Sequence, residues 1–373
     1  MKKLLFLFVA ILFVVAGCSS SDDTNSDNPG TDTFNRKALL ENIADNIAIP
    51  AYKSFKEEMA NLKTATSEFV TTADESNLVK LRTAWLDAYV SWQSVSMFEI
   101  GKAEEISFRN FMNVYPVTTT EIEKNITDGG YDLNSVSKQD EQGFGALDYL
   151  LNGLADSDTG IVAFYSSDVN ATKYKTYLSD VVERMDTLTT QVVNDWTGDY
   201  RDSFVNNSGS SATSSLDKLV NDFLFHYEKH LRAGKIGIPA GVFSNTTFNE
   251  KVEAFYKKDA SKALFNANLT ALQDFFNGKH FGSTTTGESL KTYLDFLNTI
   301  KEEEDLSTLI NNQFNLARTE ASNLADDFSA EVRTNNNLML DAYKELQKNV
   351  VFLKVDMLSA LSIRVDFVDA DGD

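Results

Sequence analysis

The residues of this chain best suited to chemistry are two histidines in the run HYEKH, His226 and His230. Residues four apart lie on one face of a helix, so the two imidazoles can reach the same divalent metal ion. The run is not the HExxH pattern of zinc peptidases, because Glu228 lies on a different helical face and cannot activate a metal-bound water. A histidine pair that lines the core or faces solvent explains the same spacing without a ligand. The third histidine, His280, lies in the loop-like run GKHFG.

A second candidate site is the run GFGALDYLLNG at 143–153, which places Gly143, Gly145 and one carboxylate, Asp148, at the start of an apolar helical segment. Glycine inside a helix costs roughly 0.5–1 kcal/mol relative to alanine, so these glycines need a reason. They could close a turn, leave room for a ligand, or mark the remains of a site. The alternative is structural: Gly145 relieves a crowded helix start, and Asp148 caps or charges the first turn. On that basis we expect Asp148→Ala to leave folding intact.

Five further residues are candidates for a pocket between the two halves of the chain. They are Trp85, Arg109, Tyr115, Lys235 and Glu253. Several lie in or beside two segments that break the helical rhythm, 102–142 and 234–245, and long irregular segments in helical proteins are usually functional or disordered. Aromatic rings beside cations could hold an anionic or planar ligand such as an iron chelate. Equally, aromatic residues at helical spacing are usually core, and the two cations could pair with the chain's excess carboxylates.

The elements that must position these residues are helices. Apolar residues recur every three or four positions along most of the chain, while sustained strand-type alternation is nearly absent. The pattern predicts an all-α protein of long antiparallel helices, most simply helix bundles. Pro50 lies inside the first helical pattern and should kink or split it. The helical patterns cover 38–72, 76–101, 171–198, 214–235, 260–277, 287–303, 305–330 and 336–361.

The clearest internal break is NNSGSSATSS at 206–215, which predicts a first bundle at 36–205 and a second at 206–373. The two halves resemble each other. ALDYLLNG at 146–153 aligns with ALQDFFNG at 271–278, and KTYL occurs once in each half. Because the matches fall in the same order, we expect two related bundles from an internal duplication, with the groove between them as the natural ligand site.

The beginning of the chain predicts export. Lys2 and Lys3 precede a twelve-residue apolar run, which is too short to span a bilayer, and small residues then lead to Cys18. This pattern is typical of a bacterial lipoprotein signal over 1–17, with Cys18, the chain's single cysteine, as the lipidated residue. The polar, acidic stretch 18–35 predicts a flexible tether. We therefore expect a cell-envelope lipoprotein of the outer membrane, held to lipid through Cys18, either periplasmic or surface-exposed.

Charge excludes one class of partner. The chain has 55 acidic and 34 basic side chains, a formal net charge of −21. Nucleic acid would be repelled by this charge, and the sequence has neither a basic patch with interleaved aromatics nor a phosphate-binding glycine loop. We expect no nucleic-acid partner.

Several ordered motifs resemble the imelysin family across essentially the whole chain after Cys18. They include ADNIAIPAY at 44–52, AWLDAYVSWQ at 84–93, GFGALDYLLNG, HYEKHLRAGKIGIPAG at 226–241 and the C-terminal run that ends in DADGD. The resemblance implies two related helix bundles in an exported or lipid-anchored protein. It also implies a role in bacterial iron uptake, and the family is nominally grouped with metallopeptidases.

The family motif is Gly-x-His-x-x-Glu, and this sequence departs from it. Gly143 matches the family glycine, Gly145 stands where the histidine should be, and Asp148 stands where the glutamate should be. Glycine supplies no ligand atom, so this helix alone would offer a metal a single carboxylate. Ligands that have moved elsewhere would be Asp148, His226 and His230.

The sequence therefore predicts a binding component in iron or metal acquisition rather than an enzyme. Its cofactor is open, with iron or another divalent metal as candidates, and its expected partners are the lipid membrane and an iron-uptake or outer-membrane transport system. No catalytic residue is assigned. One alternative is a metallopeptidase with relocated metal ligands, and another is a non-catalytic structural surface lipoprotein.

Overall fold

The structure is a computed structural model that describes residues 32–367. The expected signal segment, Cys18 and most of the tether lie outside the described residues. From Phe34 onward the chain forms one compact unit. None of the helices within the described range is long and apolar enough to cross a membrane.

Helices make up nearly all the regular structure of this unit. The α-helices are α1 (Arg36–Asn42), α2 (Ile49–Thr71), α3 (Glu75–Trp92), α4 (Lys102–Glu105), α5 (Phe108–Met112), α6 (Thr119–Asp128), α7 (Gly143–Asp148), α8 (Asp158–Ser166), α9 (Ala171–Thr197), α10 (Tyr200–Asn206), α11 (Ser215–Phe225), α12 (Ser261–Phe276), α13 (Leu290–Phe296), α14 (Leu306–Ser322), α15 (Phe328–Val350) and α16 (Leu358–Leu361). Short π-helical segments cover Ile43–Ala48, Tyr149–Gly153, His226–Gly237 and Val351–Met357, and 3₁₀ turns cover Val136–Glu141 and Asn249–Lys251. Two short strands, β1 (Ile300–Lys301) and β2 (Glu304–Asp305), form an antiparallel hairpin.

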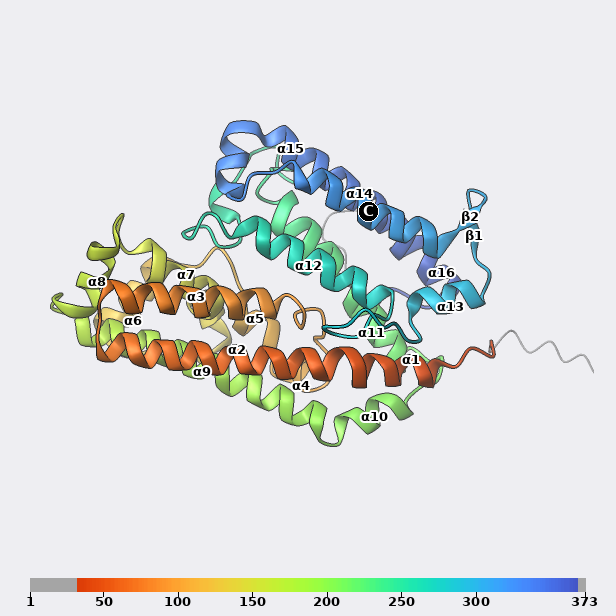
Figure 1. Cartoon of the computed structure of the whole chain (residues 1–373), viewed down its shortest axis with the longest axis horizontal. Coiled ribbons are helices and arrows are strands. Elements are labelled where there is room, and N and C mark those ends of the chain that lie inside the picture. The colour runs from red at the N-terminus through yellow and green to blue at the C-terminus, as the bar shows by residue number, and fades with distance from the viewer. Residues whose placement is uncertain (1–31, 368–373) are drawn as a thin grey trace, which may run out of the picture. The chain divides into compact units, whose positions relative to one another are not determined.

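The long helices pack in two groups. In the first, α2 lies between α3 and α9, and in the second, α14 packs against α15 and α12. Figure 1 shows both groups, with α12 running beside α3 where the groups meet. A second contact joins α1 to α11. Residues from both halves of the sequence therefore come together along α3 and α12.

The central helix α3 shows why these segments fold as they do. Asp74 caps its first turn by accepting the backbone N–H of Asn77 at 2.8 Å, which satisfies a donor that the helix leaves unpaired. Its buried residues recur at helical spacing: Leu78, Leu81, Trp85, Ala88, Tyr89 and Trp92. One face of the helix is thus core. The predicted helix at 76–101 is too long, because the chain turns after Trp92.

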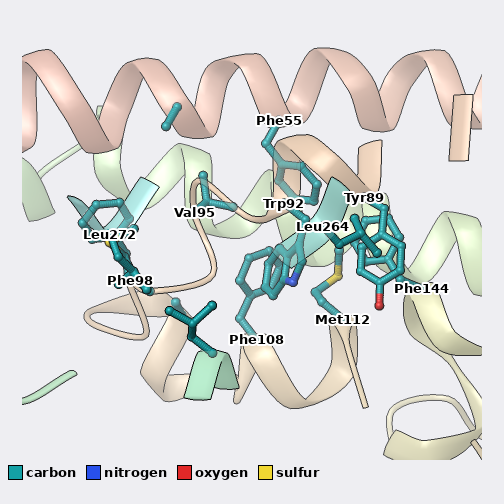
Figure 2. Packing of buried hydrophobic residues seen from close by; sticks show 14 of the residues in the cluster. Phe55, Tyr89, Trp92, Val95, Phe98, Phe108, Met112, Phe144, Leu264 and Leu272 are labelled. Atoms are coloured by element: carbon teal, nitrogen blue, oxygen red, sulfur yellow. The ribbon is translucent and has the colours of Figure 1, made fainter. Parts of the chain in front are cut away.

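Aromatic rings fill the core around α3. The rings of Tyr89 and Phe144 stack with their centroids 4.3 Å apart, and Phe55 of α2 lies against Trp92 at 5.6 Å. Figure 2 shows these rings with Leu264 and Leu272 of α12 packed into the same cluster. Such packing fixes α7, which carries Phe144, against α3.

Pro50 is accommodated without breaking the first long helix. Proline has no backbone N–H to donate to the carbonyl four residues earlier, which belongs to Asn46. The chain winds as a π-helix over Ile43–Ala48 immediately before Pro50. The Asn46 carbonyl accepts the N–H of Phe281 at 2.8 Å. The expected kink is thus a π-helical turn, which ties this helix to a loop far along the chain.

The all-α expectation is confirmed. The predicted break at 206–215 coincides with the loop between α10 and α11, whereas the division into two bundles and their duplication stay predictions. The helix predicted at 287–303 is wrong beyond Phe296, because the chain turns into the β1–β2 hairpin, whose turn residues Glu302 and Glu303 have positive φ.

Candidate functional site

The family motif lies on α7, and its first glycine is required by the backbone. Gly143 has φ +75°, a left-handed conformation that L side chains rarely adopt. A Cβ there would lie 2.3 Å from the carbonyl oxygen of Met112. Gly143 therefore lets α7 begin in direct contact with the end of α5.

Gly145, at the family histidine position, has no space for a side chain. A Cβ would lie 2.7 Å from the carbonyl oxygen of Val114 and 2.8 Å from Cγ1 of Val117. The volume that an imidazole would need is filled by the 114–117 segment. Gly145 therefore permits this segment to approach α7, which is closer to the structural explanation than to an enlarged pocket.

Asp148 is buried and joins the end of α7 to the backbone at 256–257, a connection that we call the latch. Its Oδ2 accepts the backbone N–H of Tyr256 at 2.8 Å, and its Oδ1 accepts the N–H of Lys257 at 2.9 Å and the Asn152 amide at 3.1 Å. Burial raises the pKa of Asp148 to about 7, while these hydrogen bonds act to lower it. Asp148 is the last residue of α7 and so does not cap its first turn.

Beside this latch lies a small cavity of about 170 Å³. Gly145, Asp148, Tyr115 and Tyr256 are among the residues that line it. Because both Asp148 oxygens accept backbone N–H groups, the carboxylate is already engaged. The cavity does not contain His226 or His230 among its lining residues.

The two histidines lie on the π-helical segment His226–Gly237, with their rings stacked at a centroid distance of 5.1 Å. His226 is only 2% exposed, and its Nε2 lies 3.0 Å from Nδ2 of Asn268 and 3.3 Å from Oγ of Ser96. Among the described residues, its Nδ1 has no hydrogen-bond partner. Burial, followed by the charge of Arg109, holds the pKa of both histidines well below the usual value. Both imidazoles are therefore neutral at physiological pH.

Lys235 and Glu253 form a buried ion pair. The Glu253 carboxylate also accepts the Asn113 amide at 2.8 Å and the Gln93 amide at 3.3 Å. Burial lowers the pKa of Lys235, while Glu253 opposes that shift. The positive charge of Lys235 is thus neutralised inside the protein rather than offered to a ligand.

Arg109 is neutralised in the same way. Its Nη2 donates to Oδ1 of Asp222 at 2.8 Å, and its Nε donates to the carbonyl of Ser96 at 2.7 Å. Its own backbone N–H donates to the carboxylate of Glu99, whose pKa burial raises to about 7. The interpretation of Arg109 and Lys235 as partners of the chain's carboxylates fits these contacts.

The structure brings most of the sequence candidates together around one very small cavity of about 10 Å³, which is room for a single water-sized species. Its lining includes Arg109, Tyr115, His226, His230 and Lys235. We refer to these five residues, with Glu253 and Asn268, as the polar centre. Sequence reasoning missed Asn268, although an amide inside the apolar run of α12 is itself a signal of a buried polar partner.

Trp85 and the three motif residues of α7, Gly143, Gly145 and Asp148, lie elsewhere. Trp85 belongs to the hydrophobic core, where it is fully buried and its indole N–H donates to the carbonyl of Phe144 at 3.2 Å. Asp148 lies at the other cavity, so it does not join His226 and His230 in one ligand set. Within residues 32–367, no group of three or more His, Cys, Asp or Glu side chains is arranged to hold a metal ion.

The helical groups, the buried polar centre and α7 define an all-α protein in which a motif helix is locked between segments from both halves of the chain. The sequence model of the imelysin family matches residues 48–350, so the chain belongs to that family. No curated protein matches it.

Two solved structures share the fold. One is a putative iron-regulated protein A precursor from Parabacteroides distasonis, at 18% identity and a TM-score of 0.69, covering 86% of this chain and 95% of that one. The other is an imelysin-like protein from Psychrobacter arcticum, at 17% identity and a TM-score of 0.66, covering 89% of this chain and 97% of that one. At these identities the likeness shows the fold alone.

Proposed function

We propose that this imelysin-family protein is a non-catalytic binding component of iron or metal acquisition at the cell envelope. Family membership supports the assignment, as does a structural neighbour whose name describes it as iron-regulated. The lipoprotein-type sequence around Cys18 supports the envelope location. Under this proposal Cys18 anchors the chain to the outer membrane, and the bound cargo is passed to a transport system.

The main support for a non-catalytic role is that the motif positions on α7, Gly145 and Asp148, offer no free metal ligand. A metallopeptidase needs a metal with an open coordination position and a nearby base. The histidine position of the family motif is Gly145, whose side-chain space is filled by Val114 and Val117. Both oxygens of Asp148 accept backbone N–H groups. The residues present do not fit a motif-bound metal, so we derive no catalytic step through one.

One observation favours the second candidate, a metallopeptidase with relocated ligands. The Nδ1 atom of His226 is buried and without a partner among the described residues, and the His230 ring stacks on the same imidazole. These two side chains could supply two nitrogen ligands. A zinc peptidase site would also need a third protein ligand and a base that activates the metal-bound water.

The deciding experiment has two arms. In the first, a strain lacking the gene is grown with and without an iron chelator and complemented with the wild type or with Cys18→Ala. We expect a growth defect only under iron limitation, restored by the wild type and not by the unanchored variant. If the deletion strain grows as well as the complemented strain both with and without the chelator, a structural surface lipoprotein is favoured.

In the second arm, metal content and proteolysis are measured on the purified chain from Ser19 onward, with His226→Ala as the matched variant. Our proposal expects no peptidase activity and no zinc that depends on His226. Stoichiometric zinc lost in His226→Ala, together with proteolysis lost in the same variant, would establish the metallopeptidase instead. Protease treatment of whole cells separates a surface-exposed from a periplasmic location.

A further inference from the structure

A large cavity in the described part of the chain is separate from the motif and the polar centre. It has a volume of about 720 Å³ and lies between α2, α3, α12 and the loop 279–282. We call it the α3–α12 groove. Its size falls within the roughly 300–1,000 Å³ usual for small-molecule sites. Both halves of the chain build its walls, along the line where α12 runs beside α3 in Figure 1.

Small side chains keep this groove open. Alanines and serines line it where larger residues would close it: Ala51 and Ser54 of α2, Ser91 of α3, Ser94 in the turn after α3, and Ala267 and Ala271 of α12. The loop that closes one end is held in place by the Phe281 N–H, which donates to the Asn46 carbonyl that Pro50 cannot use. The groove therefore depends on the residues that α2, α3, α12 and the loop 279–282 contribute to its walls.

The interior surface is mainly apolar. Its apolar lining includes Leu86 and Val90 of α3, Phe275 of α12 and Met97. Phe281 is partly exposed at its edge. An apolar ligand body could therefore replace water against these side chains, which is the main source of affinity in such sites.

The charged groups of the groove are predominantly acidic. Glu58, Asp87 and Asp274 line it together with one lysine, Lys279, and with His280. Lys279 is paired with Asp274 at 3.0 Å. Within residues 32–367, the Asp87 carboxylate forms no hydrogen bond or ion pair, and Glu58 accepts only the exposed Asn61 amide. Two carboxylates are therefore uncompensated, in a chain whose net charge is −21.

We propose that the α3–α12 groove binds a small organic cation with an apolar body. The cavity supplies volume and apolar surface, and Glu58 and Asp87 supply the negative potential that favours a cation over an anion of the same shape. This deepens the proposed binding role and rests on it. It also moves the ligand away from Arg109 and Lys235, whose charges are already neutralised by Asp222 and Glu253.

The test uses two probes of nearly equal size and opposite charge, tetraphenylphosphonium and tetraphenylborate. Binding is measured by titration calorimetry on the chain from Ser19 onward, which contains the whole compact unit that begins at Phe34. We expect the phosphonium to bind at least tenfold more tightly than the borate. Equal affinities, or tighter borate binding, would overturn the proposal.

Variants localise the site. Ala271→Phe places a ring in the groove and should weaken phosphonium binding at least tenfold. The double change Glu58→Gln with Asp87→Asn should weaken it about three- to tenfold. Glu57→Gln is the matched control, because Glu57 is an exposed acid on the same helix and does not line the groove. Unchanged affinity in Ala271→Phe with a native melting curve would show that the probe binds elsewhere.

The outcome is separable from that of the proposed function. If the wild type binds phosphonium and Ala271→Phe does not, while the deletion strain grows normally under iron limitation, the groove is a ligand site and the iron role is rejected. If the deletion strain grows poorly under iron limitation, Ala271→Phe restores its growth, and the wild type does not bind phosphonium, the iron role is supported and the groove proposal is rejected.

Discussion

Replacing Asp148 with alanine should destabilise the protein measurably, contrary to the expectation from its sequence position. The substitution removes the acceptor of two backbone N–H groups, those of Tyr256 and Lys257, and of the Asn152 amide. A buried donor left without a partner costs about 1–3 kcal/mol. Water can enter the adjacent cavity of about 170 Å³ and satisfy part of this loss.

The resulting decrease in the free energy of unfolding is about 2–3 kcal/mol. For a unit of this size, that corresponds to a fall in Tm of about 2–5 °C. The control is Asp87→Ala, which removes an exposed carboxylate without hydrogen bonds among the described residues and should change stability by less than about 0.5 kcal/mol. Calorimetry or circular dichroism at pH 5 supplies the comparison. A Tm for Asp148→Ala within 1 °C of the control would refute the latch.

The pH dependence of the same variant gives an independent check. Burial raises the pKa of Asp148 to about 7, whereas an unfolded aspartate has a pKa of about 4. Between these values the folded state keeps a proton that the unfolded chain has released. The stability that protonated Asp148 contributes is therefore present below about pH 4 and lost as the pH rises through 7. The difference between wild type and Asp148→Ala should shrink by about 1 kcal/mol or more from pH 5 to pH 8. A difference that widens instead would mean that the three hydrogen bonds outweigh burial.

Three further predictions concern the neighbouring residues. Gly145→Ala should lower the free energy of unfolding by about 1–3 kcal/mol, because its Cβ would lie 2.7 Å from the Val114 carbonyl, and urea denaturation at neutral pH measures this. His226 stays neutral when folded but has an ordinary pKa near 6.5 when unfolded, so its stabilising contribution is present above that pH and lost below it. His226→Gln should accordingly lower the slope of stability against pH between pH 5 and 7, and an unaltered slope would contradict the buried neutral state. Lys235→Met should destabilise by about 3–5 kcal/mol because it leaves Glu253 buried and unpaired, and adding Glu253→Gln should restore part of that loss; strictly additive losses in urea melts would argue against the pair.

The helices were the part of the fold most accessible from sequence, because their burial follows the helical period. The buried positions of α3, from Leu78 to Trp92, fall at helical spacing within the pattern predicted at 76–101. Local rules failed where the chain departs from that period over a few residues. The π-helical turn before Pro50 and the hairpin after Phe296 depend on contacts with other segments, such as the Asn46 carbonyl accepting the Phe281 N–H.

The candidate site was accessible only as a set of residue types. Sequence identified Arg109, Lys235 and Glu253 as polar groups in a helical protein, but it left open whether they face a ligand or one another. Their partners are set by tertiary packing: Arg109 pairs with Asp222, which lies in the other half of the chain. Sequence predicted a ligand groove between the two halves, but it did not indicate which residues line the α3–α12 groove, because small residues on separate helices form a cavity only after those helices are placed together.

The Asp148 contacts also give α7 a structural role that requires no metal. Gly143 and Gly145 let the backbones of 112 and 114 come within contact of α7, and Asp148 then fastens the end of that helix to the 256–257 backbone. A glutamate would carry its carboxylate one methylene further, and a histidine at 145 would displace Val114. Glycine at 145 and aspartate at 148 are therefore mutually consistent. Gly145 leaves room for the 114–117 segment, and Asp148 binds the 256–257 backbone. On this reasoning a single Gly145→His change cannot restore a metal site, because the imidazole would have to move the 114–117 segment before it could reach any ligand position.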